Sequence, residues 1–244
     1  MFPRAGGRGR KQVFLAAVVL LVATAFVLML VARLGRVPTT FSGTLLEPPM
    51  PAAPFELRNQ RDETFRLADA RGKVVVLTFL YTRCVDVCPF IAVKLKRTME
   101  LLGDVASQVE VVVVSTDPVG DTPEQVAAYS REFGMYDRWH YLLGTREQLE
   151  PVWRSYFVGL PEATGDSSFA SDAELRLYGL TRGLDDAAVA TANRVRTTLG
   201  GGPGIGHTTP VWLIDPGQNI RVKHGQDLEP SQLASDIRNL LRKP

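Results

Sequence analysis

The chain is poor in the residues that carry redox and soft-metal chemistry. Of its 244 residues, only two are cysteines and three are histidines. Both cysteines, Cys84 and Cys88, stand in the stretch YTRCVDVCPF. A disulfide bond between them would close a very short loop, and the stabilisation from a cross-link grows with the length of the loop. A structural disulfide is therefore a weak explanation, and a redox couple or a metal site is a better one.

Acidic residues are absent from the first 36 positions, which hold six basic residues. The rest of the chain carries 22 basic and 26 acidic residues, so the net charge of +2 conceals a mildly acidic main part. Proteins that bind nucleic acid need a basic face for the phosphates. We therefore expect no nucleic-acid partner.

Polar residues are almost absent from residues 13–32, where Thr24 is the only one in twenty positions. A helix of that length is about 30 Å long, which matches the hydrocarbon core of a bilayer. The apolar part of a cleavable signal peptide is shorter, about 7–15 residues. We therefore expect a transmembrane anchor over residues 13–32 that is not cleaved.

The charges beside this apolar run predict its orientation. Four basic residues precede it in the tail 1–12, and only Arg33 and Arg36 follow it closely. Basic flanks tend to stay in the cytoplasm, so we expect a cytoplasmic tail and an extracytoplasmic main part. The run begins at residue 13, which leaves no room for a mitochondrial transit peptide before it. We therefore expect a bacterial cell membrane, crossed once.

Residues 33–54 are expected to be a tether between the anchor and one folded domain. Five prolines stand between Pro38 and Pro54, and such a composition predicts an extended, semi-rigid spacer. About 190 residues follow, which is enough for a single domain with a full core. We assign this domain to residues 55–244.

The hydrophobic patterns of the domain alternate between strands and helices. Val74–Leu80 and Val109–Ser115 are typical of strands buried on both faces of a sheet. The other predicted strands cover residues 55–57, 64–67, 140–143, 211–215 and 220–222. The predicted helices cover residues 91–102, 121–133, 145–156 and 230–241. This alternation predicts an α/β fold with a central sheet flanked by helices.

Residues 160–206 interrupt the alternation and are expected to form an insertion before the last strands of the sheet. Their pattern predicts a strand over 175–180 and an amphipathic helix over 186–199, ended by three glycines at 200–202. The glycine-rich stretch lacks the Gly-Lys-Ser/Thr ending of a phosphate-binding loop. Flexibility is the plainer reason for these glycines.

The cysteines follow a predicted buried strand, and Pro89 comes directly after them. Proline is favoured in the first turn of a helix, so we expect Cys88 at a helix N-terminus. There the helix dipole and the unpaired N–H groups favour a thiolate, which attacks disulfides and binds soft metals. Copper(I) is selected by thiolates and also suits imidazole, so a histidine is the expected third ligand.

The three histidines differ in their surroundings. His140 begins a predicted strand among apolar neighbours, and we expect a structural role for it. His224 lies in the polar stretch RVKHGQD and is expected to be solvated. His207 ends the glycine-rich loop just before the predicted strand 211–215, and it is the best candidate for a ligand. Its spacing by itself leaves both a ligand and an ordinary loop residue open.

Three segments together resemble the SCO/SenC family: GKVVVLTFLYTRCVDVCPF, VVSTDPVGDTPEQV and HTTPVWLIDPGQNI, in that order. The resemblance covers roughly residues 50–160 and 205–243, together with the anchor. Members of this family are membrane-anchored, thioredoxin-like copper proteins that assist assembly of the copper centre of cytochrome c oxidase. The resemblance implies a thioredoxin-like fold here, with Cys84, Cys88 and His207 as ligands of a copper ion.

The chain departs from the family pattern in three places. Val85 stands where the family usually has a proline, and Gly206 stands where an aspartate is common. The insertion 160–206 is far longer than the family leads us to expect, and it would recruit a partner, shield the site or shift its specificity. Asp117 and Asp121 match the family's DP-x-x-DTP segment, and we expect them to serve a turn and a helix start.

Two functions follow as expectations. The first is a membrane-anchored copper chaperone that delivers copper to the copper-bearing subunit of cytochrome c oxidase. The second is an extracytoplasmic thiol–disulfide oxidoreductase that reduces partner cysteines, with Cys84 and Cys88 as its redox-active pair. Three residues separate these cysteines and the usual redox motif has two, which favours the chaperone. Other copper chaperones and thioredoxin-like reductases are further expected partners.

Overall fold

The computed structural model describes residues 8–34, 40–159, 162–166, 171–199, 203–206 and 208–242. The chain divides into two compact units, Met1–Thr40 and Phe41–Pro244. The first unit holds one long helix, α1 (Arg8–Leu34), whose described side chains from Val13 to Met29 are all exposed. Within the described part of the chain, no helix is both long enough and apolar enough to span a bilayer.

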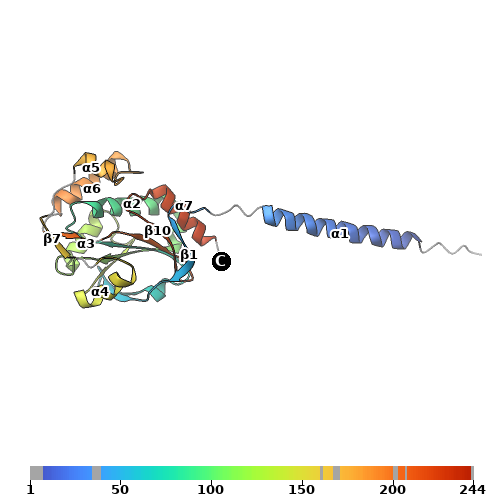
Figure 1. Cartoon of the computed structure of the whole chain (residues 1–244), viewed down its shortest axis with the longest axis horizontal. Helices are drawn as coiled ribbons and strands as arrows, with labels where there is room; N and C mark the ends of the chain where they lie inside the picture. Colours follow the sequence, from blue (N-terminus) through green and yellow to red (C-terminus); the bar gives the residue numbers. More distant parts are fainter. Residues whose placement is uncertain are drawn as a thin grey trace, which may run out of the picture. The chain divides into compact units, whose positions relative to one another are not determined.

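The described residues of the second unit form an eight-stranded mixed sheet (Figure 1). Its strand order is β1-β10-β9-β4-β5-β6-β2-β3, and the pairs β4–β5 and β5–β6 are parallel. The strands are β1 (Thr44–Pro51), β2 (Glu56–Asn59), β3 (Thr64–Arg66), β4 (Val74–Leu80), β5 (Val109–Ser115), β6 (His140–Leu143), β9 (Val211–Ile214) and β10 (Asn219–His224). A separate antiparallel hairpin joins β7 (Glu162–Asp166) to β8 (Pro203–Gly206).

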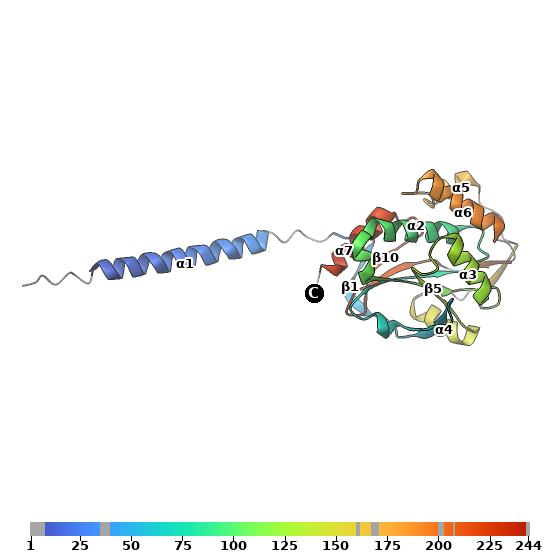
Figure 2. The ribbon, with the colours of Figure 1, turned by 180° about the vertical axis from the view of Figure 1, so that it is seen from behind.

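Helices cover both faces of this sheet (Figures 1 and 2). One face packs against α2 (Val87–Leu102), α3 (Pro123–Glu132) and α7 (Pro230–Leu241), and α6 (Asp186–Thr198) packs on the outer side of α2. The opposite face packs against α4 (Arg146–Ser155) and a short 3-10 helix, Leu67–Ala70. The other described helices are α5 (Asp172–Leu177) and the 3-10 helix Gly103–Gln108. The predicted central sheet flanked by helices is confirmed.

The central strand β4 shows how the two layers are held together. Val74 and Val76 pack on the α2 face, Val75 and Leu77 pack on the α4 face, and each is at most 1% exposed. β4 pairs with β5 on one side and with β9 on the other. A strand enclosed in this way needs apolar residues on both faces, which is why its sequence is an unbroken apolar run.

Two predicted elements differ from the structure. The tether predicted over residues 33–54 contains β1, which pairs with β10 at one edge of the sheet. Prolines are tolerated on an edge strand, because its outer N–H groups have no ladder partner. The strand predicted over 175–180 is wrong, since α5 and a turn occupy that stretch. Ser171 and Glu174 form a capping box that starts this helix, and this local signal outweighs the apolar residues that follow.

His224 is buried, so the prediction of a solvated side chain is wrong. Alternate residues of β10 face inward, and His224 is the last of them. Its Nε2 lies 3.0 Å from Oδ2 of Asp236 in α7. Asp236 also accepts hydrogen bonds at 3.0 Å from the N–H groups of Ser42 and Gly43. This carboxylate therefore fixes the start of the second unit to α7 and β10.

We expect Asp236→Ala to lower the free energy of unfolding by about 2 kcal/mol, because it leaves buried donors without an acceptor. Urea unfolding of the purified protein, followed by tryptophan fluorescence, measures this change. Asp227→Ala is the matched control, because Asp227 is exposed and its ion pair with Arg182, at 3.8 Å, lies at the surface. Equal unfolding midpoints for the two variants would contradict the role given to Asp236.

Candidate metal centre

Both cysteines lie in the turn that joins β4 to α2. The helix begins at Val87 with Asp86 as its N-cap, so Cys88 stands in the first helical turn, as predicted. Cys84 precedes the helix, and its sulfur accepts a hydrogen bond from the N–H of Cys88 at 3.4 Å. Both are free thiols, 3% and 0% exposed respectively. The turn thus places two sulfurs side by side in a largely enclosed position.

The two sulfurs differ in acidity. Burial by itself would raise the pKa of the Cys84 thiol, but hydrogen bonds from the Cys88 thiol and from the N–H groups of Cys88 and Asp86 lower it below its ordinary value. Burial raises the pKa of Cys88 well above its ordinary value, and its hydrogen bond to Cys84 adds to this rise. At Cys88 the cost of burying the charge therefore opposes the stabilisation of a thiolate that the helix start was expected to give. Cys84 is the sulfur that ionises first.

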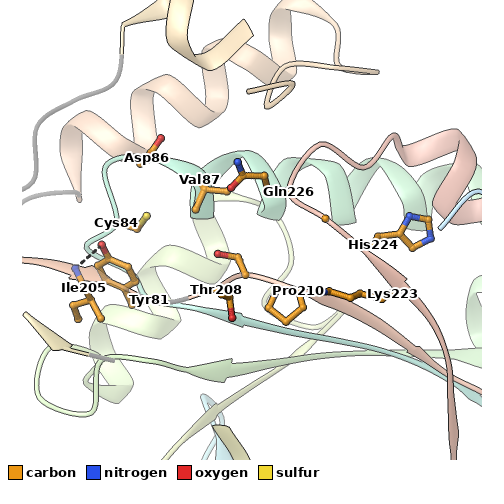
Figure 3. Close-up of a pocket in the computed structure, with 12 residues that line it drawn as sticks. Tyr81, Cys84, Asp86, Val87, Ile205, Thr208, Pro210, Lys223, His224 and Gln226 are labelled. Atoms are coloured by element: carbon orange, nitrogen blue, oxygen red, sulfur yellow. Dashed lines mark hydrogen bonds between the residues drawn. The ribbon is translucent and has the colours of Figure 1, made fainter. Parts of the chain in front are cut away.

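Cys84 borders a cavity of about 470 Å³ (Figure 3). The cysteine turn forms one wall, the segment before β9 forms another, and the end of β10 closes the third side. The N–H of Ile205 donates a hydrogen bond to the Tyr81 hydroxyl at 3.3 Å, which ties the second wall to the first. Cys84 is therefore the sulfur that a visiting ion or partner meets.

The predicted ligand His207 lies outside the described residues. Its described neighbours Ile205 and Thr208 both line the cavity beside Cys84. Among the residues that the structure does describe, no group of three His, Cys, Asp or Glu side chains is arranged to hold a metal ion. The dithiol and the two segments that flank His207 thus border the same space.

A buried carboxylate connects the cysteine turn to the end of β5. Asp121 is 6% exposed, and it accepts hydrogen bonds from the N–H and hydroxyl of Thr82 at 2.9 and 2.7 Å and from the hydroxyl of Ser115 at 2.6 Å. Burial raises the pKa of Asp121 to about 6, although these hydrogen bonds oppose the rise. Sequence reasoning assigned Asp121 only to a helix start. The DP-x-x-DTP segment marks Asp121 in the sequence, but it does not predict the contacts of Asp121 with Thr82 and Ser115.

Asp117 supports the same turn from outside. Its Oδ2 forms a salt bridge of 2.5 Å with Nη2 of Arg83, the residue before Cys84. Gly120 lies so close to both side chains that an added Cβ would come within 2.3 Å of Arg83. The turn expected at Asp117 is therefore present, and its carboxylate also orients the chain that leads to the first cysteine.

Three tyrosines near the cysteines were missed by sequence reasoning. The Tyr141 hydroxyl donates to Asp121 at 3.3 Å, and the Tyr129 hydroxyl has no hydrogen-bond partner among the described residues. Burial raises the pKa of both phenols well above its ordinary value. These two rings and that of Tyr81 are all buried. Tyr81 stands only three positions before Cys84, whereas Tyr129 and Tyr141 lie far from it in the chain and their sequence positions give no signal.

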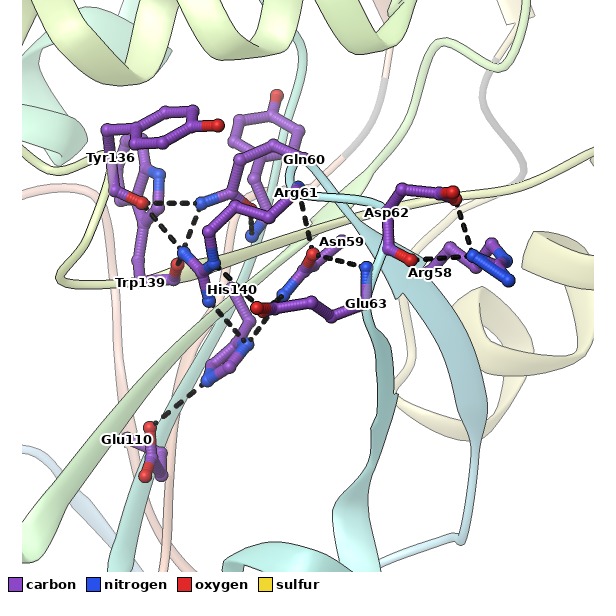
Figure 4. Close-up of polar contacts among 11 residues, drawn as sticks. Arg58, Asn59, Gln60, Arg61, Asp62, Glu63, Glu110, Tyr136, Trp139 and His140 are labelled. Carbon is purple, nitrogen blue, oxygen red and sulfur yellow. Dashed lines mark hydrogen bonds and ion pairs between the residues drawn. The ribbon is translucent and has the colours of Figure 1, made fainter.

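His140 lies in a polar cluster away from the cysteines (Figure 4). Its Nδ1 is 3.0 Å from Nδ2 of Asn59, its Nε2 is 3.4 Å from Glu110, and its ring packs against Phe65 at 4.6 Å between centroids. It begins β6, whereas the cysteine turn follows the end of β4, and both strands run in the direction of β5. His140 is level with Val112 of β5 and Leu77 of β4, short of the end of β4 that leads to the cysteine turn, and its contacts agree with the expected structural role.

The mixed sheet, with helices on both faces and a dithiol turn after a central strand, defines a thioredoxin-like protein. The SCO1/SenC family model matches residues 45–184, which is more than half of the chain. The chain therefore belongs to the SCO1/SenC family.

Known relatives agree with this assignment. A protein of Stutzerimonas stutzeri described as copper-binding is 31% identical over 145 residues, which are 57% of this chain and 69% of that protein. The chain spans about half the length of several SCO2-like proteins of Rickettsia that it also matches.

Solved structures share the fold. Apo Sco1 of Thermus thermophilus matches with a TM-score of 0.60 and 24% identity, over 83% of this chain and 98% of its own. ScoI of Bradyrhizobium japonicum, solved with copper bound, matches with a TM-score of 0.56 and 20% identity, over 78% of this chain and 98% of its own.

Proposed function

We propose that this protein binds one copper ion through Cys84, Cys88 and His207 and delivers it to the copper-bearing subunit of cytochrome c oxidase. The observation that carries this proposal is the pair of free thiols beside a cavity that is also lined by Ile205 and Thr208, which lie on either side of His207 in the chain. Thiolates select copper(I), and imidazole suits the same ion. The copper-binding relative and the copper-bound ScoI structure support this choice of cargo.

The two thiols have different roles in copper binding. Cys84 ionises first and faces the cavity, so it is the natural point of first contact for an incoming ion. Cys88 keeps its proton at the sulfur until a cation replaces it, because a lone buried thiolate is costly. Binding therefore releases protons and weakens as the pH falls.

We place the binding unit on the outer side of a bacterial cell membrane, attached through residues 13–32. The support for this location is the twenty-residue apolar run and its basic N-terminal flank. Sedimentation of cell lysates tests the location. Recovery of the full-length chain in the soluble fraction would contradict it.

Copper titration tests the proposed cargo. The reduced protein, titrated with copper(I) against a competing chelator, should bind one ion per chain. The disulfide form is the matched control and should bind none, because its sulfurs are no longer thiolates. Equal binding by the two forms, or no binding by the reduced form, would refute the proposal.

One observation favours the thiol–disulfide oxidoreductase as a second candidate. A low-pKa thiol at a cavity beside a buried, protonated thiol is the arrangement of an attacking and a resolving cysteine. The Cys84 thiolate would attack a partner disulfide and release one partner thiol. Cys88 would then lose its proton, attack Cys84 and release the second partner thiol, leaving a Cys84–Cys88 disulfide. Catalytic insulin reduction with dithiothreitol as reductant would favour this activity.

A further inference from the structure

The insertion places a buried arginine beside the cysteine turn. The inserted helix α6 packs into the core next to α2 through Ala192 and Val195, which are fully buried. Arg196 follows them on the same side and is 8% exposed. A charged side chain is rarely buried to this extent unless it meets groups that compensate its charge. The surroundings of Arg196 therefore indicate its role.

Part of those surroundings comes from the short segment that begins between the two cysteines. Nη1 of Arg196 donates to the carbonyl oxygen of Val85 at 3.5 Å. Its Cζ lies 6.0 Å from the centre of the Phe90 ring in the first turns of α2. Its charge also opposes the rise in the pKa of Asp86 that burial causes. The Arg196 guanidinium thus lies near the Val85 carbonyl and the Phe90 ring, and its charge acts on the Asp86 carboxylate.

The three residues between the cysteines lie beyond the contacts that Asp121 and Asp117 make with Thr82 and Arg83. The residues between the cysteines are Val85, Asp86 and Val87, and none of them has the fixed φ of a proline. Asp86 is the N-cap of α2, yet its side chain makes no capping hydrogen bond. The contact from the Cys88 N–H to the Cys84 sulfur depends on the conformation of these three residues. An external restraint on them therefore acts directly on the dithiol.

The insertion is itself anchored firmly enough to supply that restraint. Lys94 of α2 is fully buried, and its Nζ donates to the carbonyl oxygens of Gly179 at 3.0 Å and Gln226 at 3.1 Å. Gly179 belongs to the insertion, and Gln226 lines the cavity beside Cys84. The insertion is therefore joined both to α2 and to a wall of the cavity.

We propose that Arg196 is a positioning residue for the cysteine turn. It holds Val85 in place through the hydrogen bond and Asp86 through its positive charge, and so stabilises the turn that the reduced dithiol adopts. The part that concerns copper rests on the proposed function, whereas the part that concerns the dithiol does not. The insertion thus restrains the conformation of the site through Arg196.

The equilibrium between the protein and glutathione tests this role. Oxidation joins the sulfurs of Cys84 and Cys88 and passes two electrons and two protons to glutathione disulfide, which becomes two glutathione thiols. We expect Arg196→Met to shift this equilibrium about tenfold toward the protein disulfide, which lowers the midpoint potential by about 30 mV. Amide hydrogen exchange of residues 85–88 should become faster, and copper affinity should fall about tenfold, the lower end of the usual effect of groups that orient metal ligands.

Two further variants make the test specific. Arg194→Met is the matched control, because Arg194 lies on the same helix but pairs with Glu132 at the surface. It should leave the potential, the exchange rates and the copper affinity at wild-type values. Arg196→Lys keeps the charge and should recover most of the shift in potential.

The outcomes separate this role from the proposed function. Wild-type potential and exchange rates in Arg196→Met would overturn the positioning role, and so would equal shifts in Arg194→Met. A wild-type protein that binds no copper, but whose potential falls in Arg196→Met, would refute the copper proposal and support the positioning role. If Arg196→Met does not fold, Arg196→Gln decides, since it keeps a donor for Val85 without the charge. A wild-type potential in that variant would overturn the electrostatic part.

Discussion

His207→Ala is expected to weaken copper binding by more than about 100-fold, because groups that only orient a metal ligand already cost 10–100-fold when removed. The substitution removes the imidazole from a proposed donor set whose only other members are two thiolates. The described neighbours of His207 lie at the cavity, and Thr208 is exposed, so the free energy of unfolding should not change. Competition with a chelator of known affinity measures the loss for copper(I) and copper(II).

His140→Gln is the matched control for this variant. It removes another imidazole, but from the polar cluster that contains Asn59 and Glu110. Its copper affinity should equal that of the wild type, even if its stability falls. If His207→Ala and His140→Gln bind copper equally well, His207 is not a ligand and the dithiol acts alone.

Raising the pH from 4 to 6 should lower the stability of the wild type through Asp121, and Asp121→Asn should lack this dependence. The pKa of this buried carboxyl is about 6 in the folded protein, against an ordinary value of 3.8. Between these two values the folded protein holds the proton and the unfolded chain has released it. The contribution of Asp121 to the free energy of unfolding is therefore complete below pH 3.8 and is lost as the pH rises through 6. At about 1.4 kcal/mol per pKa unit, this amounts to about 3 kcal/mol.

Urea unfolding at several pH values between 4 and 7 measures this dependence for both proteins. The difference between the two curves isolates Asp121, because the other carboxyl groups are common to both. Asp62→Asn is the control, since the Asp62 side chain is 84% exposed and should leave the curve parallel to that of the wild type. A parallel curve for Asp121→Asn as well would show that burial does not hold the proton on this carboxyl.

Most of the fold could be predicted from local patterns. β4 and β5 begin and end at the predicted residues, because a strand between two layers of helices must be apolar throughout. α7 also has its predicted bounds, since Pro230 marks its start and an apolar face continues to Leu241. The failures at β1 and α5 have one cause. Prolines on an edge strand and a capping box before a short helix are both features that a hydrophobic pattern does not contain.

The chemical character of the site followed from the sequence alone. Two cysteines four positions apart after a buried strand and before a proline predict a reactive dithiol at a helix start, because residue type and spacing are local properties. The burial of His224 against Asp236, the lower pKa of Cys84 and the contact of Arg196 with Val85, 111 positions away in the chain, were decided by the tertiary structure. Acidity and restraint depend on which groups enclose a side chain, and those groups come from helices and strands far apart in the chain. Only folding brings them together.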